Sequence, residues 1–231
     1  MKLSILVPAY NEEASIEAIL KRLASVDFGV EHEVVVIDDG SRDATAAKVE
    51  ALKDPAVRLL RHPENRGKGA AIRTGLTSAR GDWVIVQDAD LEYDPSDIPR
   101  LLKPALSGEA EVVFGSRILN QENSFSYQRY YWGGRLVSLW TSLLYGQTIT
   151  DEPTCYKLFR TEFLRSLRLE CEGFEFCPEA TAKTLRRGKK ILELPISYNP
   201  RTIAEGKKIR WTDGVIALWW LLKLRLSHDP V

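Results

Sequence analysis

Runs of β-branched and aliphatic residues alternate with segments of helical periodicity through the first half of the chain. The strand-like runs occupy residues 3–9, 33–39, 57–62, 82–90 and 110–117. Between them lie helical patterns at 16–23, 41–52, 67–80 and 95–106, the first of which places Ile16, Ile19, Leu20 and Leu23 on one face. This alternation predicts an α/β fold, with a mostly parallel sheet covered by helices on both faces.

The composition favours one globular domain and excludes several classes of protein. A chain of 231 residues with 44% apolar content can bury one sizeable core. Its 32 basic and 32 acidic residues balance, so we expect no nucleic acid partner. Three cysteines without a CxxC pair argue against a disulfide framework and a zinc site, and favour a reducing cytosol. We also expect no signal peptide and no membrane-spanning segment.

Polar residues follow three of the predicted strands, where a parallel sheet binds its ligands. The first strand ends in PAYNE (8–12), the second in Asp38 and Asp39, and a later one in Asp88 and Asp90. Two acids two residues apart on an extended chain point the same way, so they can share a magnesium or manganese ion. The alternative is structural: a lone pair of this kind more often caps a helix or turn.

Five segments carry a more specific signal: SILVPAYNEE, VVVIDDGSRDAT, NRGKGAAIRTG, GDWVIVQDADLEYDP and FGSR. In this order and spacing they resemble the family 2 glycosyltransferases, which have the Rossmann-like GT-A fold. The likeness is greatest to the branch that holds dolichyl-phosphate mannose synthase and related polyprenyl-phosphate glycosyltransferases. It implies a GT-A domain over residues 1–210, followed at 211–231 by an apolar or amphipathic helix that could associate with a membrane.

The resemblance implies an inverting transfer of mannose or glucose from a nucleotide-diphosphate sugar to a polyprenyl phosphate. It implies that the base and ribose lie among Pro8, Tyr10, Glu12, Ile37 and Asp39. It also implies that Mg²⁺ or Mn²⁺ and the diphosphate lie at Asp88, Ala89 and Asp90, with Glu92 as a further metal ligand where the branch often has Gln. The remaining residues that it implies are Arg117 beside the diphosphate and acceptor, Arg129 near the acceptor phosphate, and Arg201 and Lys207 on the donor phosphates. In this scheme Asp90, Arg117 and Arg129 are the catalytic residues.

The chemistry of the acceptor leaves alternatives open. A phosphomonoester has its second pKa near about 6, so it arrives ionised and needs no strong base. A soluble, glycolipid or polysaccharide hydroxyl would need a base. Glu179 is either that base, a residue that positions the acceptor, or a helix cap. The sequence lacks the glycine signatures of dinucleotide oxidoreductases and P-loop enzymes. A nucleotide-sugar-binding protein without activity is the remaining alternative.

Two apolar segments lie in the less regular second half, YYWGGRLVSLWTSLLYG (130–146) and GVIALWWLLKLRL (214–226). Both combine tryptophan with nearby cationic residues, a pattern typical of helices that lie in the headgroup layer of a membrane. We therefore expect peripheral association with the cytoplasmic face of a membrane. The alternatives are that the segments pack on the sheet or form the seam of a homodimer.

Overall fold

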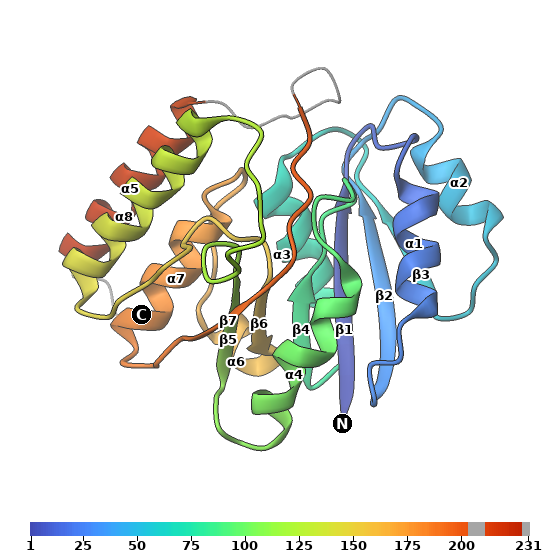
Figure 1. Ribbon diagram of the computed structural model, residues 1–231. Helices are drawn as coiled ribbons and strands as arrows, with labels where there is room; N and C mark the ends of the chain where they lie inside the picture. Colours follow the sequence, from blue (N-terminus) through green and yellow to red (C-terminus); the bar gives the residue numbers. More distant parts are fainter. Residues whose placement is uncertain (203–210, 228–231) are drawn as a thin grey trace.

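The computed structural model describes residues 1–202 and 211–227 (Figure 1). Its strands are β1 (Lys2–Ala9), β2 (Glu31–Asp38), β3 (Val57–Arg61), β4 (Trp83–Val86), β5 (Val112–Ser116), β6 (Lys157–Arg160) and β7 (Leu192–Pro195). Its helices are α1 (Ile16–Ser25), α2 (Thr45–Ala51), α3 (Lys68–Ser78), the 3-10 turn η1 (Pro95–Asp97), α4 (Ile98–Leu106), α5 (Gln128–Tyr145), α6 (Thr161–Ser166), α7 (Phe176–Arg186) and α8 (Trp211–Leu226). The predicted alternation of strands and helices is confirmed through β5.

The strands form one sheet in the order β3-β2-β1-β4-β6-β5-β7. All neighbouring strands run parallel except β6, which is antiparallel to both β4 and β5. The predicted α/β class with a mostly parallel sheet is confirmed. Because β6 runs the opposite way, the loop that precedes it reaches the edge where β4 and β5 end. The residues of this loop therefore meet the polar residues that follow the parallel strands.

The core sits on both faces of the sheet. Successive residues of β1 and β2 are buried, as in strands covered by helices on each side. The four apolar residues of α1 that share one face are all 3% exposed or less. On α3, a Cβ at Gly75 would lie 2.7 Å from Ile37 Cδ1, so glycine at this position permits the close approach of α3 to β2.

A second apolar cluster joins α5, α7 and α8 at one end of the molecule, where α5 and α8 lie side by side (Figure 1). Val137 of α5, Ala182 of α7, and Leu221 and Leu224 of α8 form its buried centre. Tyr145 donates a hydrogen bond of 2.7 Å from its hydroxyl to the carbonyl of Leu221. None of the helices in the described ranges is long and apolar enough to cross a bilayer.

Candidate active site

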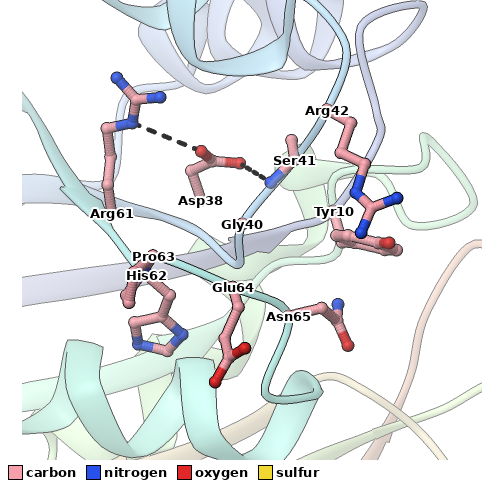
Figure 2. A pocket seen from close by; sticks show the side chains of 10 residues that line it. All are labelled: Tyr10, Asp38, Gly40, Ser41, Arg42, Arg61, His62, Pro63, Glu64 and Asn65. Atoms are coloured by element: carbon pink, nitrogen blue, oxygen red, sulfur yellow. Dashed lines mark hydrogen bonds and ion pairs between the residues drawn. The ribbon is translucent and has the colours of Figure 1, made fainter.

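A cavity of about 500 Å³ opens at the carboxyl ends of β1, β2 and β3 (Figure 2). Asp38, at the end of β2, is 1% exposed and accepts a hydrogen bond of 3.2 Å from the amide of Ser41. Arg61 Nε lies 3.6 Å from its other oxygen. Both interactions fix the walls of the cavity, whose lining residues are Tyr10, Asp38, Gly40, Ser41, Arg42, Arg61, His62, Pro63, Glu64 and Asn65.

Asp39 holds the loop at 62–67, and residues 62–65 of this loop line the cavity. Its Oδ1 lies 2.6 Å from His62 Nδ1 and accepts a 3.0 Å hydrogen bond from the amide of Arg66. Its Oδ2 accepts from Asn65 Nδ2 at 3.0 Å and from the Gly67 amide at 2.7 Å. Asp39 is 3% exposed, so its carboxylate shapes the pocket by holding residues 62–67. Its predicted contact with the ribose or base stays a prediction.

Asp88, just beyond β4, forms an ion pair with Lys68, a residue outside the predicted site. Lys68 Nζ lies 2.5 Å from Asp88 Oδ1 and 3.6 Å from the thiol of Cys155, which belongs to the loop before β6. Phe174 lies against Lys68: its ring centre is 5.9 Å from Lys68 Nζ, and the residue is 41% exposed. The GK pair in NRGKG, at the start of a predicted helix, was the signal that could have identified Lys68.

Asp90 lies in an acidic cluster with Glu12 and Glu92, and Arg201 lies near all three carboxylates. Arg201 Nη2 donates to Asp90 Oδ2 at 2.9 Å, and Nη1 lies 3.5 Å from Glu12 Oε2. Glu92 accepts from the Tyr198 hydroxyl at 3.0 Å and from the Arg201 amide at 2.9 Å. Burial, together with the charges of Asp88 and Glu92, raises the pKa of Asp90 to about 7, although Arg201 opposes this shift. The structure therefore brings the predicted residues Glu12, Asp90, Glu92 and Arg201 together.

Asp88 and Asp90 suit a divalent ion by their chemistry. Magnesium is usually held by one or two carboxylates together with substrate phosphates and water, rather than by a cage of protein ligands. Within residues 1–202 and 211–227 no group of three or more His, Cys, Asp or Glu is arranged to hold a metal. The two carboxylates pair with Lys68 and Arg201 instead. Glu92 as a third ligand stays a prediction.

Arg117, at the end of β5, is held by Asp151 from the loop before β6. Its Nε and Nη2 donate to the two oxygens of Asp151 at 2.8 and 2.7 Å. The guanidinium also lies 5.0 Å from the ring centre of Tyr198. Burial disfavours the charged form, but the Asp151 carboxylate outweighs it and raises the pKa of Arg117. Sequence reasoning missed Asp151, because nothing in DEPTCYK indicates that its loop reaches β5.

The remaining residues of the predicted site that the structure describes differ in their burial and in their position in the fold. Pro8 is the last but one residue of β1 and is half-buried, whereas Ile37 and Ala89 are buried and contribute packing or backbone atoms. Arg129 is exposed in the first turn of α5, where it stacks 5.1 Å from the ring centres of both Tyr127 and Tyr130. Lys207 lies outside the described residues.

Glu179 of α7 is fully buried and organises a loop. Its carboxylate accepts hydrogen bonds from the amides of Glu170 and Cys171 at 2.9 Å and forms an ion pair with Lys183. Burial would raise its pKa, but these donors outweigh it and hold the pKa below the ordinary value. Such a carboxylate is a poor proton acceptor, so the geometry favours positioning of the loop over general base catalysis.

The sequence of this chain is similar to those of known proteins. Residues 4–168 match the family model described as glycosyl transferase family 2. An undecaprenyl-phosphate mannosyltransferase of Micrococcus luteus is 32% identical, with 98% of this chain and all of that protein covered. A dolichol-phosphate mannosyltransferase of Pyrococcus furiosus is 29% identical over 90% of this chain and 59% of its own length.

The fold has solved counterparts. Glucosyl-3-phosphoglycerate synthase from Mycobacterium tuberculosis, crystallised with Mn²⁺, uridine diphosphate and phosphoglyceric acid, superposes with a TM-score of 0.77 at 22% identity. The match covers 99% of this chain and 80% of that one. From the family model and the full-length Micrococcus relative, the chain belongs to glycosyl transferase family 2.

Proposed function

We propose that this glycosyltransferase moves a hexose, mannose or glucose, from a nucleotide-diphosphate sugar to a polyprenyl phosphate at the cytoplasmic face of a membrane. One observation carries the proposal: the paired carboxylates Asp88 and Asp90 lie at the same sheet edge as a cavity of about 500 Å³. The cavity would take the base and ribose, and the diphosphate would extend towards the carboxylates. The similarity to an undecaprenyl-phosphate and a dolichol-phosphate mannosyltransferase supports the acceptor class.

The chemistry of transfer follows from the charges at this edge. An acceptor phosphate oxygen attacks the anomeric carbon as the bond to the nucleotide diphosphate breaks, and the configuration inverts. Magnesium or manganese bound at Asp88 and Asp90 would neutralise charge on the departing diphosphate. Arg117 and Arg201 carry guanidinium groups suited to phosphate oxygens, and Asp151 fixes the orientation of the first.

The state of Glu179 favours a phosphate over a hydroxyl as the acceptor. A hydroxyl needs a base to remove its proton, whereas a phosphomonoester is already ionised near neutral pH. Glu179 is enclosed by backbone amides and Lys183, so it is unavailable for this role. Transfer to a soluble, glycolipid or polysaccharide hydroxyl is therefore the second candidate.

The outer faces of α5 and α8 support action at a membrane surface. Trp132, Leu136, Leu139 and Leu143 of α5 recur every three or four residues and are 55–69% exposed. Trp211, Val215, Ile216 and Trp219 of α8 are also exposed. Arg129 lies in the first turn of α5, which would place a cation near the level at which an acceptor phosphate emerges from the bilayer.

A panel assay tests the proposal directly. Purified protein is incubated with GDP-mannose, UDP-glucose or a related donor, with and without a polyprenyl phosphate in detergent, and with Mg²⁺, Mn²⁺ or chelator. We expect transfer from one donor that depends on both the lipid phosphate and the metal. Transfer to a hydroxyl acceptor would select the second candidate. Binding without transfer or hydrolysis of any donor would identify a nucleotide-sugar-binding protein.

A further inference from the structure

We propose that Arg201 is an internal counter-ion of the ligand-free site, which a divalent metal must displace from Asp90 and which then passes to the donor diphosphate. The proposal rests on the proposed function, because it takes Asp90 as a metal ligand. It adds a role for Arg201 before the donor binds: this side chain opposes metal binding in the absence of nucleotide and supports it in the presence of nucleotide.

The contacts of Arg201 carry the proposal. Its three guanidinium nitrogens face three carboxylates: Nη2 is 2.9 Å from Asp90, Nη1 is 3.5 Å from Glu12, and Nε is 3.9 Å from Glu92. The backbone of Arg201 is fixed as well, because its amide donates to Glu92 Oε1 at 2.9 Å. The side chain is only 19% exposed. One buried cation therefore bridges carboxylates that would otherwise repel one another.

The geometry of the guanidinium shows that this arrangement is not its best set of partners. Nε is buried and makes no hydrogen bond within the described part of the chain, and the contact to Glu12 is long. Arginine pairs most strongly with two oxygens at once, as a diphosphate offers. A donor diphosphate would therefore offer Arg201 better hydrogen-bond partners than Asp90 does.

The two cations that pair with this cluster among the described side chains are held in different ways. Glu12, Asp88, Asp90 and Glu92 are formally four anions, and among the described side chains Lys68 and Arg201 form ion pairs with them. Lys68 is tied to Asp88 at the start of α3, whereas Arg201 lies two residues after Asn199 on an irregular segment. Arg201 is therefore the cation of the two that can move without disturbing a helix.

Mn²⁺ binding separates this role from a simple phosphate contact. Metal-free protein is titrated with Mn²⁺, and the unbound ion is counted by electron paramagnetic resonance, with no nucleotide, with GDP or with UDP. The variants are Arg201→Gln and Arg201→Lys. Arg100→Gln is the matched control, because Arg100 of α4 forms an ion pair with Asp97 of η1, outside the cluster.

Without nucleotide, Arg201→Gln should bind Mn²⁺ about tenfold more tightly than wild type, since a competing charge a few Å away has been removed. With the preferred nucleotide this advantage should disappear, so the enhancement by nucleotide falls by about tenfold or more. Arg201→Lys keeps one cation but cannot span three carboxylates, and should bind with intermediate affinity. Arg100→Gln should match wild type.

Equal or weaker Mn²⁺ binding by Arg201→Gln without nucleotide, beside normal nucleotide-dependent binding by wild type, overturns this inference and leaves the proposed function intact. If Arg201→Gln does not fold, Arg201→Lys decides, and an affinity equal to that of wild type overturns the inference. Wild type that binds no Mn²⁺ even with GDP or UDP contradicts the metal-dependent function itself.

Discussion

Asp39 and Asp90 lie at the same edge of the sheet, but their carboxylates have opposite surroundings. Backbone amides, an amide side chain and an imidazole enclose Asp39. Asp90 has two acids nearby and shares Arg201 with one of them. The surroundings of Asp39 stabilise a carboxylate that maintains the pocket. Those of Asp90 concentrate negative charge, which a bound cation can compensate.

For Asp39, we expect Asp39→Asn to destabilise the protein and weaken nucleotide binding together. Asparagine would direct an NH₂ group at two of the present donors and leave them buried without an acceptor, at a cost of about 1–3 kcal/mol. Urea denaturation and calorimetric titration with GDP and UDP measure the two effects. Weaker nucleotide binding at unchanged stability would instead indicate a direct contact with the nucleotide and little role in holding the loop.

Asp90 should make the stability of the metal-free protein depend on pH. Its pKa of about 7 lies above the value of about 3.9 for an unfolded Asp, so the folded state binds more protons between these values. Stability therefore falls as the pH rises from about 4 to about 7 and levels off above that. Asp90→Asn should remove this slope and add about 1–3 kcal/mol to the free energy of unfolding above pH 7.

Urea denaturation of wild type and Asp90→Asn in chelator, at several pH values from 5 to 8, checks this expectation. A difference in stability that is the same at pH 5 and pH 8 would contradict it. The same variant should lose metal-dependent transfer, which a helix-capping role for Asp90 does not predict.

At the scale of elements, Glu179 links α7 to α3 through the loop at 170–174. The amides of Gly69 and Ala70, in the first turn of α3, donate to the carbonyls of Gly173 and Glu172 at 3.0 Å. Glu179 holds the other end of this loop. The loop in turn positions Phe174 over Lys68.

We expect Glu179→Ala to lower stability by about 3–5 kcal/mol, because it leaves Lys183 and two backbone amides without their buried partner. Activity should fall with the folded fraction. Thermal denaturation followed by circular dichroism, with the transfer rate expressed per folded molecule, provides the test. Lys189→Ala, which removes an exposed ion pair with Glu111, is the control. A large loss of rate in a protein of normal stability would restore Glu179 as a catalytic base.

The sequence predicted the elements whose pattern is local, and it missed those fixed by long-range pairing. The strands through β5 follow from apolar runs, and α1 follows from its single apolar face. β6 is only four residues long and has neither a long apolar run nor clear alternation, so its place between β4 and β5 follows from tertiary pairing. Asp151 and Cys155 reach the site through that strand, and they were missed for the same reason.

At the scale of the whole molecule, the exposed faces of α5 and α8 predict binding to anionic vesicles. We expect wild type to float with phosphatidylglycerol-containing liposomes, and Trp132→Glu/Leu139→Glu on α5 or Val215→Glu/Trp219→Glu on α8 to float at least several-fold less. These positions are 55–65% exposed, so the charges should leave the fold intact, as circular dichroism can verify. Leu119→Glu, on an exposed residue outside both helices, is the control.

Equal flotation of all folded variants, or none by wild type, would contradict membrane binding through these faces. Light scattering on the same proteins tests whether a second copy of the chain, rather than lipid, covers these faces. A dimer that the α5 or α8 variants convert to a monomer would indicate that the two faces form a homodimer seam.

The position of β6 also has a consequence during synthesis of the chain. The strands β1 to β4 can pair as soon as they emerge, but the open edge of β4, whose residues all end up buried, has to wait for Lys157–Arg160. At about 5–20 residues per second the ribosome leaves this edge uncovered for about 4–14 seconds. An apolar strand with unpaired amides and carbonyls is a template for association with other chains. Nascent chains stalled between α4 and β6 should therefore be the aggregation-prone species, and chaperones that shield strand edges should act in that interval.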